Sequence, residues 1–242
     1  MIKGVFFDLY GTLLIYGDMV AAYKDQISAF QRFVVRKGYT ISTDMLSSYY
    51  QNIMKRPTQP TLDESSIFER QLEDICNEIG VRLTGYETSE LAEVCVCAWQ
   101  KHIQLDPQTA PLLRQLRQTS QTALITNFDH PPHINQVLRE LELSALFDAI
   151  IISGSVGLRK PDHRIFEMAL RATALSAYQV IFVGDSQEDI QGAIAAGMQP
   201  VYIRRPSTNN PDASLKSVDA QLLSQAIVIT DLRELTGLVN SL

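Results

Sequence analysis

The sequence predicts an α/β fold, a doubly wound parallel sheet with an inserted helical segment. Short apolar runs that resemble buried strands recur along the chain, amphipathic helical patterns separate most of them, and one long early segment is helical without a convincing strand. Parallel strands joined by crossover helices form a sheet covered on both faces, and ligands bind beyond the carboxyl ends of such strands. Those strand ends are where we expect the chemistry.

Six apolar runs predict the strands. The first, IKGVFF, covers residues 2–7 and is followed by the Gly11-Thr12 turn; the other five cover residues 122–126, 149–152, 180–184, 200–203 and 226–230. Residues 133–143 and 163–170 carry apolar side chains at helical spacing, and Asp162 precedes the second of these segments as an N-cap residue.

The helical segment lies between the first and second of these strands. We expect an α/β core domain made of residues 1–14 and 91–242 and a helical cap domain made of residues 15–90. A helical unit beside the catalytic edge is suited to act as a lid that excludes water. The expected helices cover residues 18–37, 43–55, 63–79 and 87–103, and the last of them leads back into the core.

Composition excludes several classes of protein. The 242 residues are 45% hydrophobic, which is enough for a substantial core. The net charge is -6 and no long Lys/Arg cluster is present, which excludes nucleic acid as a partner. Asp8 interrupts the apolar N-terminus, and no run approaches the roughly 20 apolar residues of a membrane span. We expect a soluble cytoplasmic protein without a membrane partner, either a monomer or a homodimer.

Neither the cysteines nor the histidines indicate a metal site by their spacing. An odd number of cysteines does not suggest a disulfide framework, so we expect all three as reduced, small core residues. We expect His130 in an exposed loop. The residues concerned are Cys76, Cys95 and Cys97, and His102, His130, His133 and His163.

Polar side chains follow four of the predicted strands. Singly, each is more typical of a turn or a helix cap. Together they supply the parts of a phosphoryl-transfer site: a carboxylate that attacks phosphorus, a lysine and a hydroxyl that orient its oxygens, and further acids that hold Mg²⁺. The residues are Asp8 with Thr12, Thr126 with Asn127, Lys160, and Asp185 with Asp189.

Four motifs in this order resemble the haloacid dehalogenase (HAD) superfamily, in the branch with a helical cap after the first motif. They are DLYGT (8–12), LITN (124–127), GLRKPD (157–162) and VGDSQEDIQGA (183–193), and the resemblance covers nearly the whole chain. It implies a Rossmann-like core, a hydrolase that acts through an aspartate nucleophile, and Mg²⁺ as the cofactor.

The resemblance also assigns roles to residues. It implies Asp8 as the nucleophile and Lys160 as the charge that steadies Asp8 and the phosphate, with Thr126 and Asn127 as substrate contacts. Gly11 permits the sharp turn, and Thr12 ties the loop internally. The implied magnesium ligands are Asp8, the backbone carbonyl of Tyr10, Asp185 and Asp189.

Tyr10 departs from the family's phosphatases, which usually have a second aspartate two residues after the nucleophile. A phenol with an ordinary pKa of about 10 is a poor base. Tyrosine here is similar to 2-haloacid dehalogenases, in which halide leaves unprotonated and no metal is needed, whereas Asp185 and Asp189 favour magnesium and phosphate. Tyr10 itself, a cap residue, Glu188 or water are the candidates for the missing acid-base group.

Three functions follow from these features. The first is Mg²⁺-dependent hydrolysis of a phosphate monoester of a small soluble metabolite, with Tyr10 near the substrate in place of the usual aspartate. The second is a 2-haloacid dehalogenase-like hydrolase. The third, from another class, is a weakly catalytic or non-catalytic protein that binds a phosphate ligand for regulation.

Overall fold

The computed structural model describes residues 1–56, 65–205 and 218–242. The chain forms two compact units. One comprises Met1–Gly17, Gln104–Phe128 and Ile134–Leu242, and the other comprises Asp18–Ile103 and Asp129–His133. We refer to them as the α/β unit and the helical unit.

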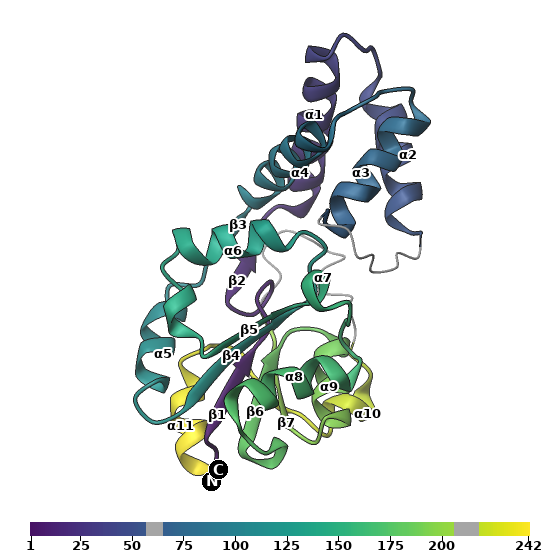
Figure 1. The fold of residues 1–242 in the computed structure, drawn as a ribbon. Coiled ribbons are helices and arrows are strands. Elements are labelled where there is room, and N and C mark those ends of the chain that lie inside the picture. The colour runs from purple at the N-terminus through teal and green to yellow at the C-terminus, as the bar shows by residue number, and fades with distance from the viewer. Residues whose placement is uncertain (57–64, 206–217) are drawn as a thin grey trace. The chain divides into compact units, whose positions relative to one another are not determined.

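The α/β unit is built on a six-stranded sheet in the order β5-β4-β1-β6-β7-β8, and every neighbouring pair is parallel. Figure 1 labels β5, β4, β1, β6 and β7 of this sheet. The predicted α/β doubly wound sheet is therefore confirmed, and all six predicted strands are present. The sheet strands are β1 (Gly4–Phe7), β4 (Gln121–Thr126), β5 (Ala149–Ile152), β6 (Val180–Gly184), β7 (Gln199–Ile203) and β8 (Ile227–Ile229). The sequence did not predict β2 (Leu14–Tyr16) and β3 (Ile103–Leu105), which form a separate two-stranded sheet.

Helices cover the sheet of the α/β unit. On one face, α8 packs on β4 and β5, and α9 packs on β6 and β7. Phe6, Phe166 and Phe182 are central to the core on that face. The helices of this unit are α5 (Thr109–Leu116), α6 (Pro131–Glu140) from Ile134 onward, α7 (Ser153–Val156), α8 (His163–Thr173), α9 (Gln187–Ala195), α10 (Ala220–Leu223) and α11 (Glu234–Ser241), with 3₁₀ turns at Ser144–Leu146 and Ala177–Gln179.

The helical unit contains α1 (Met19–Arg36), α2 (Thr43–Met54), α3 (Ile67–Glu78) and α4 (Gly85–Gln100). These match the four predicted helices, although residues 63 and 64 of the third prediction lie outside the described residues. The sequence prediction ended the helical segment at residue 90. In the structure α4 buries one face against α1 and α3, so the unit extends to Ile103 and also takes in the start of α6.

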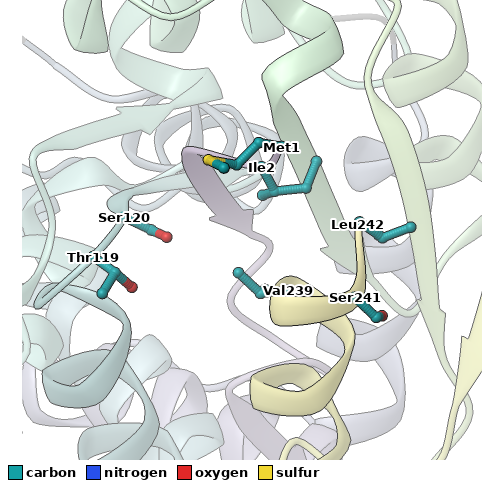
Figure 2. A pocket seen from close by; sticks show the side chains of 7 residues that line it. All are labelled: Met1, Ile2, Thr119, Ser120, Val239, Ser241 and Leu242. Carbon is teal, nitrogen blue, oxygen red and sulfur yellow. The ribbon is translucent and has the colours of Figure 1, made fainter.

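A hollow of about 380 Å³ lies at the amino end of the sheet, where the two chain ends meet. Figure 2 shows Met1 and Ile2 beside Val239, Ser241 and Leu242. The hollow lies at the opposite edge from the carboxyl strand ends, so it takes no part in the site described below. None of the described helices has both the length and the apolar composition to cross a membrane.

Candidate active site

The register of the sheet brings the predicted site residues to one edge. Phe7, the last residue of β1, lies opposite Leu124 of β4 and Val183 of β6. The Asp8 amide donates to the Val183 carbonyl at 2.9 Å, which fixes the chain just past the strand end. Asp8 therefore leaves the sheet between two strands whose own ends carry the other candidate groups.

Lys160 joins two of the predicted acids. Its Nζ lies 2.6 Å from Asp8 Oδ1 and 2.6 Å from Asp189 Oδ1. All three residues are buried, with 6% of Asp8, 6% of Lys160 and 1% of Asp189 exposed. The contact with Asp8 was expected, whereas the bridge to Asp189 was not.

Asp189 is held by the first turn of α9. Ser186 is the N-cap of this helix, and its backbone amide and hydroxyl donate to Asp189 Oδ2 at 3.0 and 2.7 Å. This capping box satisfies one carboxylate oxygen. The other, Oδ1, is buried and pairs with Lys160 by distance, but it accepts no aligned hydrogen bond from the described residues.

Asp185 reaches the cluster because two glycines leave room. Gly11 has φ of 89°, as the sequence predicted for a sharp turn, and a Cβ there would lie 2.1 Å from Asp185 Oδ2. A Cβ on Gly184 would lie 2.4 Å from the Asp189 side chain. The glycines at these two positions therefore allow both carboxylates to approach Asp8.

Gly11→Ala is expected to destabilise the protein more than Gly38→Ala. Gly38 has nearly the same φ, 88°, but nothing lies within 4 Å of its added Cβ. Gly38→Ala is therefore the control, and its loss of stability measures backbone strain alone, about 1–2 kcal/mol. At Gly11 the clash with Asp185 should add about 1–3 kcal/mol to that loss. Urea unfolding of both variants checks this; equal losses would mean that Asp185 does not depend on Gly11.

The electrostatics of the cluster are unbalanced without a further cation. Burial, together with the charge of Asp189, raises the pKa of Asp8 to about 6, even though Lys160 opposes the shift. Burial also disfavours the charged form of Lys160, but the two carboxylates outweigh that effect and raise its pKa. With all groups ionised, three carboxylates and one ammonium leave a net charge of −2.

The three acids fit a divalent cation. One carboxylate oxygen each from Asp8, Asp185 and Asp189 lies within 4.8 Å of the others. Oxygen-only ligands are the set that Mg²⁺ prefers. Both the excess negative charge and the unsatisfied Asp189 Oδ1 are consistent with a cation at this position.

Asn127 fastens the segment that carries Lys160. Its Nδ2 donates to the Lys160 carbonyl at 3.1 Å, and its Oδ1 accepts from the Lys160 amide at 2.9 Å. The side chain thereby links the ends of β4 and of the loop after α7. Thr126, the last residue of β4, is 1% exposed beside it.

Tyr10 is the centre of an aromatic group. Its ring stacks with those of Tyr16 and Phe128, with centroids 6.4 and 5.4 Å away. Burial, and then the charge of Asp8, raise the pKa of Tyr10. The pKa of Tyr16 is raised by burial and by Asp185 and Asp8, which places a second phenol near the acids. Tyr10 is therefore a neutral phenol at neutral pH.

Residues that the sequence did not single out support the loop after Tyr10. Arg205 pairs with Asp106 at 2.6 Å, and its other terminal nitrogen donates to the Thr12 carbonyl at 2.5 Å. The Thr109 hydroxyl donates to Leu13. The Thr12 hydroxyl, expected to tie the loop internally, is buried without a hydrogen bond to the described residues. Partners this far apart in sequence leave no local signal.

Two further expectations were wrong. His130 is buried, with 2% of its surface exposed, because the Asp129–His133 segment packs within the helical unit. Cys97 is exposed, whereas Cys76 and Cys95 are buried as expected.

Known proteins are similar to this chain in sequence and in fold. A family model described as haloacid dehalogenase-like hydrolase matches residues 2–197. The chain is 24% identical to an (S)-2-haloacid dehalogenase of Pseudomonas putida over 84% of this chain and 86% of that protein. It is 35% identical to a phosphoserine phosphatase of Thermus thermophilus over 46% of this chain and 45% of that protein.

A solved structure of a 2-haloacid dehalogenase from Pseudomonas syringae has a TM-score of 0.69 and 22% identity, and covers 100% of this chain and 99% of that one. This likeness shows the fold. The family match spans most of the chain and all four motifs, so the chain belongs to the haloacid dehalogenase-like hydrolases.

Proposed function

We propose that this hydrolase removes phosphate from monoesters of a small metabolite in a Mg²⁺-dependent reaction. The observation that carries the proposal is the cluster of three carboxylates whose ligand oxygens lie within 4.8 Å of one another beside Lys160. A halide-displacing site has no need of two extra acids next to its nucleophile, because they repel the nucleophilic carboxylate. The phosphoserine phosphatase among the relatives is consistent with this class of substrate.

Asp8 is the proposed nucleophile. Its carboxylate attacks phosphorus, the ester P–O bond breaks with its electron pair on the leaving oxygen, and an aspartyl-phosphate forms. Water then attacks that phosphorus, which releases inorganic phosphate and restores Asp8. Lys160 orients Asp8 through the 2.6 Å contact and offsets charge on the transferred group.

The remaining residues position these groups. The Thr126 hydroxyl and the Asn127 amide are the proposed contacts to the phosphate, and Asn127 also holds the backbone of Lys160. Asp8, Asp185, Asp189 and the Tyr10 carbonyl would hold Mg²⁺. When bound, the ion supplies positive charge to the phosphate oxygens.

Asp185→Asn is expected to lower the affinity for Mg²⁺ by at least about tenfold and to raise the Mg²⁺ concentration needed for half-maximal phosphate release. Asp185 is one of the three clustered acids, whereas Glu188, an exposed acid in the same turn, is not. Glu188→Gln is thus the matched control and should keep the wild-type affinity.

Titration of Mg²⁺ into chelator-treated protein, with release of phosphate from an aryl phosphate as the readout, measures both variants. Activity that persists in full after chelation would contradict the magnesium assignment. A loss in Glu188→Gln equal to that in Asp185→Asn would move the ion, or the missing acid-base group, to Glu188.

Tyr10 determines which leaving groups a phosphate ester can have and still be cleaved rapidly. A buried phenol with a raised pKa neither takes a proton from water nor exists as a base at neutral pH. Leaving groups that depart as stable anions need no proton donor, whereas an alkoxide does. We therefore propose a preference for activated phosphate esters.

Tyr10→Asp is expected to raise hydrolysis of an alkyl phosphate by about tenfold or more, and to change hydrolysis of an aryl phosphate much less. The new carboxyl supplies the proton that an alkoxide needs. Tyr10→Phe, which keeps the ring and its stacking with Phe128, is the control and should raise neither rate. Equal effects of Tyr10→Asp on both esters would show that another group already acts as the acid.

The dehalogenase reaction is the second candidate, and Tyr10 is the observation that favours it. A neutral aromatic residue beside the nucleophile suits displacement of halide from carbon, and one relative of this chain is an (S)-2-haloacid dehalogenase. Release of halide from 2-chloropropionate without added metal would support this candidate over the phosphatase.

A further inference from the structure

The helical unit contains a second cluster of metal-ligating side chains. Glu93 and Cys97 of α4 and His133 of α6 each place one ligand atom within 4.8 Å of the others. All three belong to the helical unit. The cluster thus combines an oxygen, a sulfur and a nitrogen ligand, unlike the all-carboxylate cluster beside Lys160.

Helical spacing places these ligands side by side. Residues four apart lie on the same face of a helix, so Glu93 and Cys97 project together from α4, and Gln100 continues the stripe one turn later. His130 and His133 are three residues apart at the start of α6. No metal-ligand spacing is recognisable in the sequence, because the pair Glu93 and Cys97 lies more than thirty residues before the pair His130 and His133.

Gln100 orients the His133 ring. His133 Nε2 lies 3.2 Å from Gln100 Oε1, so the proton of the neutral ring resides on Nε2. The lone pair of Nδ1 then faces Glu93 Oε2 at 3.9 Å, beyond hydrogen-bonding distance. The ring is 98% buried, so this orientation is fixed by packing as well.

Glu93 is oriented from its other side. His130 Nε2 lies 3.1 Å from Glu93 Oε1, and His130 Nδ1 lies 2.7 Å from the Ser66 hydroxyl at the start of α3. This chain of contacts occupies one carboxylate oxygen. The other, Oε2, faces the Cys97 sulfur at 4.0 Å and His133.

We propose that Glu93, Cys97 and His133 bind a Zn²⁺ ion, with water in the fourth position. Zinc bound to sulfur at about 2.3 Å and to nitrogen or oxygen at about 2.0–2.2 Å sets neighbouring ligand atoms about 3.4–3.6 Å apart in a tetrahedron. Glu93 Oε2 lies 3.9 Å from His133 Nδ1 and 4.0 Å from Cys97 Sγ, so small side-chain movements would bring these atoms to tetrahedral separations. A thiolate and an imidazole select zinc over magnesium.

Bound zinc would fasten the Asp129–His133 segment to α4. That segment follows Asn127 and Phe128 directly in the chain, and Phe128 stacks on Tyr10. The ion therefore stabilises a segment next in sequence to the candidate active site. Zinc would bind here whichever reaction the α/β unit catalyses.

Cobalt provides the test, because a thiolate ligand gives Co²⁺ an intense charge-transfer band in the near ultraviolet. The full-length protein is titrated with Co²⁺ and then with Zn²⁺, in excess Mg²⁺ so that Mg²⁺ competes with Co²⁺ for the carboxylate cluster. We expect one equivalent of Co²⁺ to produce the band and Zn²⁺ to abolish it.

Cys97→Ser should lose the band and bind Zn²⁺ at least about 100-fold more weakly, while Gln100→Ala should weaken binding about tenfold. Cys97 is exposed, so its substitution leaves the core intact. His102→Gln is the control, because His102 pairs with Asp25 away from the cluster. Absence of the band in the wild-type protein, or unchanged Zn²⁺ affinity in Cys97→Ser, would overturn the proposal.

Discussion

Asp8→Asn is expected to abolish turnover, with a loss of at least about 10⁴-fold in kcat. An amide of the same shape cannot attack phosphorus or carbon, so the loss should appear with either class of substrate. The fold should persist, because Lys160 keeps its 2.6 Å contact with Asp189. Initial rates under substrate saturation measure the loss of kcat, and circular dichroism checks that the fold is retained.

Asp162→Asn is the matched control for this substitution. Asp162 lies two residues after Lys160 and caps α8 by accepting from the Arg164 amide. Asparagine caps a helix as well as aspartate does, so this variant should retain wild-type activity. Full activity in Asp8→Asn would refute the nucleophile assignment.

Lys160→Met is expected to lower the free energy of unfolding by about 3–5 kcal/mol at neutral pH, because it leaves two buried carboxylates without their counterion. Turnover should fall in the same variant, since Asp8 loses the contact that orients it. Lys24→Met, which changes an exposed lysine of α1, is the control and should change stability little. Urea unfolding with the divalent cations chelated measures the difference.

The cost of Lys160→Met should shrink in acid. The raised pKa of Asp8, about 6, means that the folded protein binds a proton there at a pH where the unfolded chain does not. Below that pH Asp8 is neutral, so less of its attraction to Lys160 remains to be lost. A cost that grows in acid would show that Lys160 does not act chiefly as the counterion of these acids.

The sheet could be predicted from the sequence because its strands are buried on both faces. Continuous apolar runs such as VIFVG identify such strands without an alignment. The parallel order then brings Asp8, Thr126 and Asp185 to one edge. Strands β2 and β3 have three residues each, too few for a periodic pattern.

The finer geometry of the site depends on contacts that sequence spacing does not encode. The bridge from Lys160 to Asp189 and the double hydrogen bond from Asn127 to the Lys160 backbone both join distant segments. The burial of His130 has the same origin, because packing of the helical unit decides it. Residue type and motif order predicted which side chains come together at the site. Tertiary packing decides which hydrogen bonds and ion pairs each of them makes.

A paired assay on one preparation of the wild-type protein tests the proposed function most directly. An activated aryl phosphate is supplied with and without Mg²⁺, and 2-chloropropionate is supplied to a parallel sample while halide release is followed. We predict phosphate release that requires Mg²⁺ and no halide release. Metal-independent release of halide, without phosphatase activity, would contradict the account and show that Tyr10, and not the pair Asp185 and Asp189, indicates the reaction.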